Sequence, residues 1–213
     1  ASETQPRTGI LASYKEVWRH PYFRSLMPMG FFNYGGMVAM QTLWAGPWMV
    51  KVAGYSPLEA ATGLFWLNVC MLITFWLWGL FTPSLTKRGY SANKLMTYGV
   101  PVNLCVQTYI ILSGADAGAL HWILFCISSS FVSLAQPAVG MAFPSALAGR
   151  ALSAYNLVLF LGVFVVQWGM GLMIDGFKAA GWQESQSFQL AMAVFFACCL
   201  ASYGYFLKHK SDS

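Results

Sequence analysis

The sequence predicts an all-α membrane protein with six transmembrane helices, because of its composition and its six long apolar stretches. Hydrophobic residues make up 57% of the 213 positions and charged residues only 9%, whereas a soluble domain has about 25% charged residues. Each stretch is close to the roughly 20 residues that a helix needs to cross about 30 Å of hydrocarbon. All six are apolar on every side, unlike the short alternating strands of a transmembrane barrel. The predicted spans cover residues 26–50, 58–81, 93–113, 119–142, 151–174 and 188–207.

Polar segments flank the six spans. Residues 1–24 are expected to form a cytoplasmic linker and an amphipathic lead-in, residues 25–207 the transmembrane domain, and residues 208–213 a cytoplasmic tail. The first 20 residues have no apolar core followed by a cleavage site, so they do not form a signal peptide.

The basic residues predict which side of the membrane holds the termini. With six spans, both termini and the loops at 82–92 and 143–150 share one side. That side carries ten basic residues: Arg7, Lys15, Arg19, Arg24, Lys87, Arg88, Lys94, Arg150, Lys208 and Lys210. The other side keeps Lys51 and Lys178 with Glu59, Asp116, Asp175 and Glu184. Because basic loops stay in the cytoplasm, both termini are expected there. The net charge of +5 then reflects insertion into a lipid bilayer and needs no nucleic-acid partner.

Cysteine and histidine form no pattern typical of a catalytic or metal site. The five cysteines, Cys70, Cys105, Cys126, Cys198 and Cys199, all fall inside predicted spans without metal or redox spacing. The three histidines lie far apart in the sequence, at span ends. We therefore expect no metal, no cofactor and no enzymatic activity.

Three stretches of the chain carry a family resemblance. They are FPSALAGRALSAYNLVLFLGVFVVQWGMGLMIDGF at 143–177, YKEVWRHPYFRSL at 14–26 and GPWMVKVAGYSPLEAATGL at 46–64. The first resembles the region of the tenth and eleventh helices of major facilitator superfamily transporters, with its Phe-Pro turn, Gly-Arg-Ala step, Asn, and later Gln and glycines. The other two resemble the lead-in to the seventh helix and the junction of the seventh and eighth helices.

The resemblance implies the C-terminal six-helix half of a secondary active transporter, which moves a small-molecule substrate by alternating access. Such a half is built from two inverted three-helix repeats and encloses a midplane site together with an N-terminal half. The chain begins at Ala1 without methionine, so we expect the missing N-terminal six-helix half to precede it. The implied location is a bacterial inner membrane. Two alternatives stay open: a half-transporter that pairs as a dimer, and a non-transporting scaffold or receptor-like subunit.

One loop departs from the pattern of the superfamily. The sequence GLFTPSLTKRGYSANK at 79–94 has the basic, glycine-containing cluster of the cytoplasmic signature but no acidic residue. The resemblance makes Lys87, Arg88 and Gly89 candidates for a gating loop, with Arg150 in the next cytoplasmic turn. The alternative is that these charges only fix the topology of the chain.

On the first span, the resemblance makes polar and aromatic residues candidates for the substrate cavity. Asn33, Gln41 and Trp44 fall roughly on one side of a regular helix, and Tyr34 lies next to them. The pair Gly35–Gly36 either loosens this helix or lets a neighbouring helix approach closely. Tryptophans near span ends, such as Trp48 and Trp122, are expected to be interface anchors.

The fourth and fifth spans carry further cavity candidates. Ser129, Ser133 and Gln136 recur at a helical spacing directly before Pro137, and Ser133 and Gln136 are taken as candidates. On the fifth span, Asn156 and Gln167 almost superpose in projection, whereas Gly162 and Gly169 lie roughly opposite them. These polar side chains either meet substrate or hold helices together.

No ionisable residue lies near the centre of any predicted span. Such residues are the usual carriers of protons and the usual partners of charged substrates in membranes. A proton relay is therefore not evident in this half. Asn68, Asn103 and Gln107 also lie inside spans, and the sequence assigns them no role.

Overall fold

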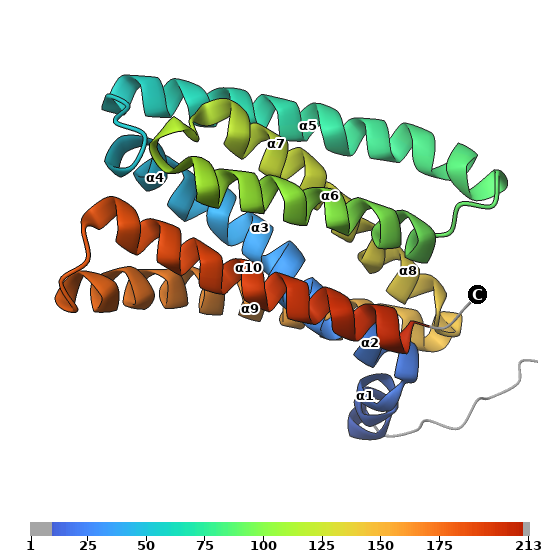
Figure 1. The fold of residues 1–213 in the computed structure, drawn as a ribbon. Coiled ribbons are helices and arrows are strands. Elements are labelled where there is room, and N and C mark those ends of the chain that lie inside the picture. The colour runs from blue at the N-terminus through green and yellow to red at the C-terminus, as the bar shows by residue number, and fades with distance from the viewer. Residues whose placement is uncertain (1–9, 211–213) are drawn as a thin grey trace, which may run out of the picture.

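The computed structural model describes residues 10–210, with side chains from residue 12 onward, and forms a bundle of helices (Figure 1). The parts of the predicted linker and tail at 1–9 and 211–213 lie outside the described residues. The elements are α1 (Ile10–Arg19), α2 (Pro21–Met29), η1 (Gly30–Tyr34), α3 (Gly35–Ala39), η2 (Met40–Trp44), α4 (Ala45–Lys51), α5 (Pro57–Lys87), α6 (Ala92–Ser113), η3 (Gly114–Asp116), α7 (Ala119–Ser129), η4 (Ser130–Leu134), α8 (Ala135–Met141), α9 (Ser145–Ala179) and α10 (Glu184–His209).

Five stretches within residues 10–210 are long and apolar enough to cross a membrane. They are Pro57–Lys87, Ala92–Asp116, Ala119–Met141, Ser145–Ala179 and Glu184–His209. These helices correspond to the second to sixth predicted spans and confirm an all-α membrane protein. Two of them begin at serine caps, since the Oγ of Ser56 accepts a hydrogen bond from the Glu59 amide and that of Ser91 from the Lys94 amide.

The first predicted span, 26–50, differs from the other five. Residues 21–51 are helical throughout, but α2, α3 and α4 alternate with the π-helical segments η1 and η2. Asn33 lies in η1 and Gln41 in η2, so each π-helical segment carries one amide side chain. For these reasons the stretch is not one of the five long apolar helices. The π turns also shift the side chains out of the phase of a regular α-helix.

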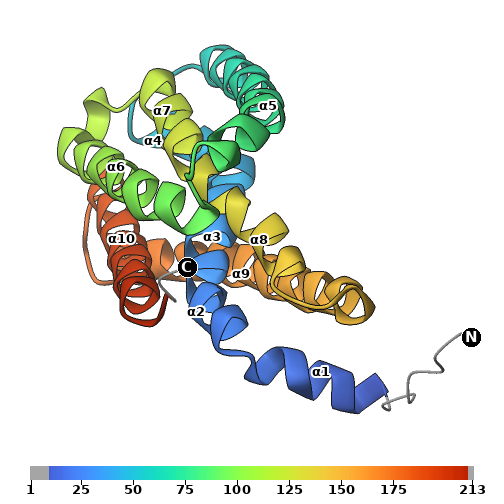
Figure 2. The same cartoon turned by 90° about the vertical axis from the view of Figure 1, so that its right-hand side faces the viewer.

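Residues 21–51 pass through the middle of the bundle (Figures 1 and 2). The helix α3 packs on α9, while α10 contacts α2, α6 and α9. The helix α7 contacts both α5 and α6. In Figure 2, α5 and α9 lie on either side of α3 and α8. Only 11% of the apolar window of α5 is buried, so this flank of the bundle is largely uncovered.

Two glycines set the closest approach between the central helix and α9. A Cβ added to Gly35 would lie 2.8 Å from the carbonyl oxygen of Leu159, and one added to Gly162 would lie 2.9 Å from the Cα of Phe31. Both contacts involve backbone, which has no room to move aside. The sequence left open whether Gly35 loosens the helix or packs, and these contacts favour packing.

The interface role expected for Trp48 and Trp122 is wrong. Both side chains are almost fully buried, with 2% and 1% of their surface exposed. Their rings meet edge to face with centroids 5.7 Å apart, and Trp48 Nε1 donates to the carbonyl of Ala117 at 3.0 Å. Trp48 thus satisfies its N–H inside the protein and needs no lipid headgroup.

The amphipathic helix α1 lies against α9 at the end of the bundle where α5 ends and α6 begins (Figure 1). Ser13 and Val17 are buried on its inner face, while Lys15 and Arg19 are exposed. The guanidinium of Arg150 donates to Ser13 Oγ at 2.6 Å. This contact attaches the lead-in to the first turns of α9.

Candidate functional site

Predicted cavity residues form hydrogen bonds between the central helix and α5. Gln41 Nε2 in η2 donates to Asn68 Oδ1 on α5 at 3.0 Å. Asn68 Nδ2 in turn donates to the carbonyl of Leu64 at 2.8 Å. Gln41 is half-buried and Asn68 is exposed, so this pair lies at the uncovered flank.

A second set of contacts joins the central helix to α9. Gln167 Nε2 donates to Thr42 Oγ1 at 3.0 Å, and Thr42 Oγ1 donates to the carbonyl of Val38 at 2.6 Å. Trp44 Nε1 donates to the backbone carbonyl of Gln167 at 3.2 Å. The segment η2 therefore contacts α5 through Gln41 and α9 through Thr42 and Trp44.

A third contact joins α8 and α9. Gln136 Nε2 donates to Asn156 Oδ1 at 2.7 Å, and both side chains are half-buried. Pro137, which follows Gln136, is exposed. We call the six side chains Gln41, Thr42, Asn68, Gln136, Asn156 and Gln167 the amide strip.

The amide strip offers unpaired donors and acceptors without any charge. Within residues 10–210, no hydrogen bond occupies Gln41 Oε1, Gln136 Oε1 or Asn156 Nδ2. A primary amide carries both a donor and an acceptor, so each pair still presents hydrogen-bonding groups. Such a surface suits an uncharged ligand with hydroxyl, carbonyl or amide groups.

Three other predicted cavity residues lie apart from the amide strip. Asn33 is buried against α10, where its Nδ2 donates to Ser202 Oγ at 2.7 Å. Tyr34 is half-buried and forms no hydrogen bond with another described residue. Ser133 Oγ donates to the carbonyl of Ser130 at 2.7 Å. The π segments separate Asn33 from Gln41, which a regular helix would bring to one side.

The spacing of Ser129, Ser133 and Gln136 does not produce a single face. The 3-10 segment η4 lies between Ser129 and Gln136 and turns the chain more tightly than an α-helix. Ser129 is buried and accepts a hydrogen bond from Asn103 Nδ2 at 2.7 Å, whereas Gln136 contacts α9. The fourth span therefore presents one cavity candidate from this pattern, Gln136.

Sequence reasoning left Asn103 and Gln107 without a role, and the structure buries both of them. Asn103 Nδ2 reaches the carbonyl of Phe125 at 3.1 Å and two serine hydroxyls of α7. Gln107 Nε2 donates to Asn103 Oδ1 at 2.7 Å. These amides hold α6 against α7. Thr42 and Asn68, in contrast, belong to the amide strip, although sequence reasoning did not propose them for the cavity. The one sequence feature that could have identified them is a polar side chain inside an apolar span.

The predicted gating residues lie in the turn between α5 and α6. Lys87, Arg88 and Gly89 are exposed, and Gly89 has a positive φ of 82° that ends the helix. Lys94 Nζ donates to the carbonyl of Gly89 at 3.2 Å. Arg150 is not part of this turn, since it contacts α1.

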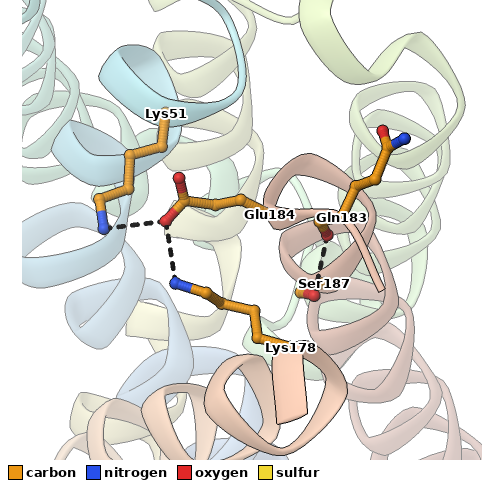
Figure 3. Close-up of polar contacts among 5 residues, drawn as sticks. All are labelled: Lys51, Lys178, Gln183, Glu184 and Ser187. Atoms are coloured by element: carbon orange, nitrogen blue, oxygen red, sulfur yellow. Dashed lines mark hydrogen bonds and ion pairs between the residues drawn. The ribbon is translucent and has the colours of Figure 1, made fainter. Parts of the chain in front are cut away.

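An ion cluster joins three helix ends at the other end of the bundle (Figure 3). Glu184, which begins α10, accepts from Lys51 Nζ at 3.1 Å and from Lys178 Nζ at 3.3 Å. Hydrogen bonds from the two ammonium groups lower the pKa of the Glu184 carboxyl. Both lysines were assigned to the less basic side of the membrane, and the structure brings them together there.

The structure shows no metal-binding constellation within residues 10–210. No group of three or more His, Cys, Asp or Glu side chains is close enough to hold an ion. The five cysteines are free thiols, and Cys126 and Cys199 are buried.

Comparison with known proteins identifies the fold. No family model and no curated protein matches this sequence. A solved structure of a bacterial homologue of the human lysosomal transporter Spinster, inward-facing and unoccupied, matches with a TM-score of 0.62 at 12% identity. The match covers 100% of this chain and 54% of the other. The chain thus has the fold of about half of that transporter, which agrees with the half-transporter fold predicted from the sequence.

Proposed function

We propose that this chain is the C-terminal half of a secondary active transporter, which moves a small uncharged solute by alternating access. The fold of about half of such a transporter supports the proposal. In this account, residues 21–51 with α5 and α6 form one three-helix repeat, and α7 to α10 form the second, inverted repeat. An N-terminal half then faces the uncovered flank, and both termini lie in the cytoplasm of a bacterial inner membrane.

The observation that carries the proposal is the exposure of the amide strip within helices of membrane length. Asn68 is exposed on α5, and Gln136 and Asn156 are half-buried where α8 meets α9. A polar group in contact with hydrocarbon is unfavourable unless it has a hydrogen-bonding partner. The unpaired atoms of the strip therefore require water, a ligand or another protein surface. A water-filled cavity between two halves supplies all three.

The absence of charge along the strip supports an uncharged substrate. Among residues 10–210, no ionisable residue forms a hydrogen bond with any of its six side chains. Charged substrates in membranes are usually met by an ionisable partner. The basic turn at Lys87, Arg88 and Gly89 stays a candidate for the cytoplasmic gate.

Single-cysteine labelling tests whether the strip lines a cavity. In a background that lacks the five native cysteines, Asn156→Cys and Gln167→Cys are treated with a charged, water-soluble thiol reagent in native membranes. Leu161→Cys is the matched control, because it lies on the same helix about 140° around from Asn156 and is 51% exposed. We expect labelling at positions 156 and 167 and protection at 161.

Two other outcomes would count against the proposal. Protection at all three positions would mean that the amides only hold helices together, which is the scaffold alternative. Equal labelling at all three would mean that α9 has no lipid-facing side at this depth. Either result leaves the fold assignment intact and removes the transport cavity.

A further inference from the structure

A second cavity lies at the basic end of the bundle, away from the amide strip. Its volume is about 470 Å³, within the range of ligand-binding pockets. It is enclosed by the start of α2, the end of α5, the start of α6, and α8. Figure 2 looks onto this end of the bundle. Leu95, Leu134, Pro137 and Met141 make much of its wall apolar.

Polar groups converge on one edge of this cavity. Tyr22 OH donates to Asn93 Oδ1 at 3.0 Å. Asn93 is only 7% exposed, and its Nδ2 has no hydrogen-bond partner among residues 10–210. The Nδ1 atom of His20, which also lines the cavity, is buried without a partner in the same part of the chain. A buried polar atom without a partner, such as His20 Nδ1, is uncommon in a native protein. Together with the unpaired amide of Asn93, it gives this edge unused capacity to bind a ligand.

Positive charge lies in the turn next to this edge. Thr86 and Tyr90 line the cavity, and the exposed Lys87 and Arg88 lie between them in the turn from α5 to α6. No acidic residue in the described part of the chain lines the cavity, and residues 79–94 contain none. The cavity therefore combines an apolar wall with a neutral polar edge, and the basic turn of Lys87 and Arg88 borders it and forms its rim.

We propose that this cavity binds an anionic phospholipid from the adjacent leaflet. The phosphate would lie at the rim formed by Lys87 and Arg88, within reach of the free amide of Asn93, and the glycerol and upper acyl chain would pack on Pro137 and Met141. Basic pockets between transmembrane helices are suited to anionic lipid headgroups. The proposal does not depend on the transport function, because it uses none of the residues of the amide strip.

A protein segment is the competing occupant of the cavity. A peptide that filled it would need to supply acidic side chains for Lys87 and Arg88. Glu16, four residues before the lining residue His20, lies on α1, which packs on α9. Bilayer lipid, in contrast, already surrounds this end of the helices. The charge of the rim and the apolar wall together favour a lipid.

Native mass spectrometry of the full-length protein tests the proposal by titration with phosphatidylglycerol or phosphatidylcholine. We expect the wild-type protein to bind phosphatidylglycerol about tenfold more tightly, and the Lys87→Gln/Arg88→Gln variant to lose that preference. The control variant Lys15→Gln/Lys208→Gln removes the same charge from exposed positions at the same end of the bundle, away from the cavity, and should retain the preference.

A cavity-filling variant and a competitor separate specific binding from surface attraction. Thr86→Trp keeps every charge but fills the cavity, so it should abolish binding of phosphatidylglycerol. The proposal is overturned if this variant still binds the lipid, if the control loses as much affinity as the double variant at 87 and 88, or if phosphatidylcholine binds equally well. Displacement of the lipid by inorganic phosphate alone would also overturn it, because the apolar wall would then contribute nothing.

Discussion

Replacing Gly162 by alanine should destabilise the bundle at the crossing of the central helix and α9. The added Cβ would lie 2.9 Å from the Cα of Phe31, whereas two carbon atoms normally approach to about 3.5–4.0 Å. Because the obstructing atoms are backbone, the two helices must separate by at least about 0.6 Å. The opposing glycine, Gly35, would lose its own close contact with α9 in the same movement.

The size of the effect follows from packing at this crossing. When two helices separate by about 0.5–1 Å, the atom pairs across their interface lose a quarter to a half of their van der Waals attraction. Overpacking of a well-packed core typically lowers the free energy of unfolding by about 1–3 kcal/mol. Alanine recovers part of this loss because it favours a helix over glycine by roughly 0.5–1 kcal/mol. We expect a net loss of about 1–2 kcal/mol in the free energy of unfolding.

The assay follows modification of Cys126, which is fully buried on α7, with the other four cysteines replaced. A loss of about 1–2 kcal/mol raises the unfolded fraction, and with it the labelling rate, about 5- to 30-fold. Gly169→Ala is the matched control, because a Cβ there has no neighbour within 4 Å. An unchanged rate for Gly162→Ala, or an equal increase for Gly169→Ala, would refute this account of the crossing.

Three further changes test other contacts. Asn103→Leu should lower the free energy of unfolding by about 1–3 kcal/mol in the same assay, because it removes the α6–α7 bonds and leaves the amide of Gln107 unpaired; an unchanged rate would contradict this. Trp48→Phe, which frees the carbonyl of Ala117, should cost about 1 kcal/mol, and no measurable loss would mean that this hydrogen bond contributes nothing. Glu184→Gln should cost less than about 1 kcal/mol because the ion cluster is half-exposed. Since partners lower the pKa of Glu184, its contribution is present above the ordinary carboxyl pKa and is lost as pH falls below it. The wild type and Glu184→Gln should therefore converge in thermal stability at acidic pH, and a difference that grows on acidification would argue against the cluster.

The five long helices were predictable because length and hydropathy alone decide them. In α5, for example, the Ser56 cap and 31 residues of largely apolar sequence leave no competing structure. The first span was harder, because its sequence gives no signal for the π segments η1 and η2. Projection on a regular helix therefore grouped Asn33 with Gln41, although the structure directs Asn33 to α10.

The pairing of polar residues could be predicted only in part. Asn156 and Gln167 share a face because α9 is a regular helix, so the 11-residue spacing holds. Their partners, Gln136 and Thr42, come from helices whose mutual position depends on tertiary packing. The burial of Trp48 was missed for the same reason, since no sequence pattern distinguishes a tryptophan that faces the protein from one that faces the headgroups.

The mass of the intact particle extracted from native membranes tests the central claim most directly, because a six-helix half cannot alternate access alone. This chain accounts for 23.5 kDa. The account predicts a particle with about twice that polypeptide mass, whether the second half is part of the same polypeptide or a separate subunit. A particle with the mass of this chain alone would contradict the account and favour a role other than transport.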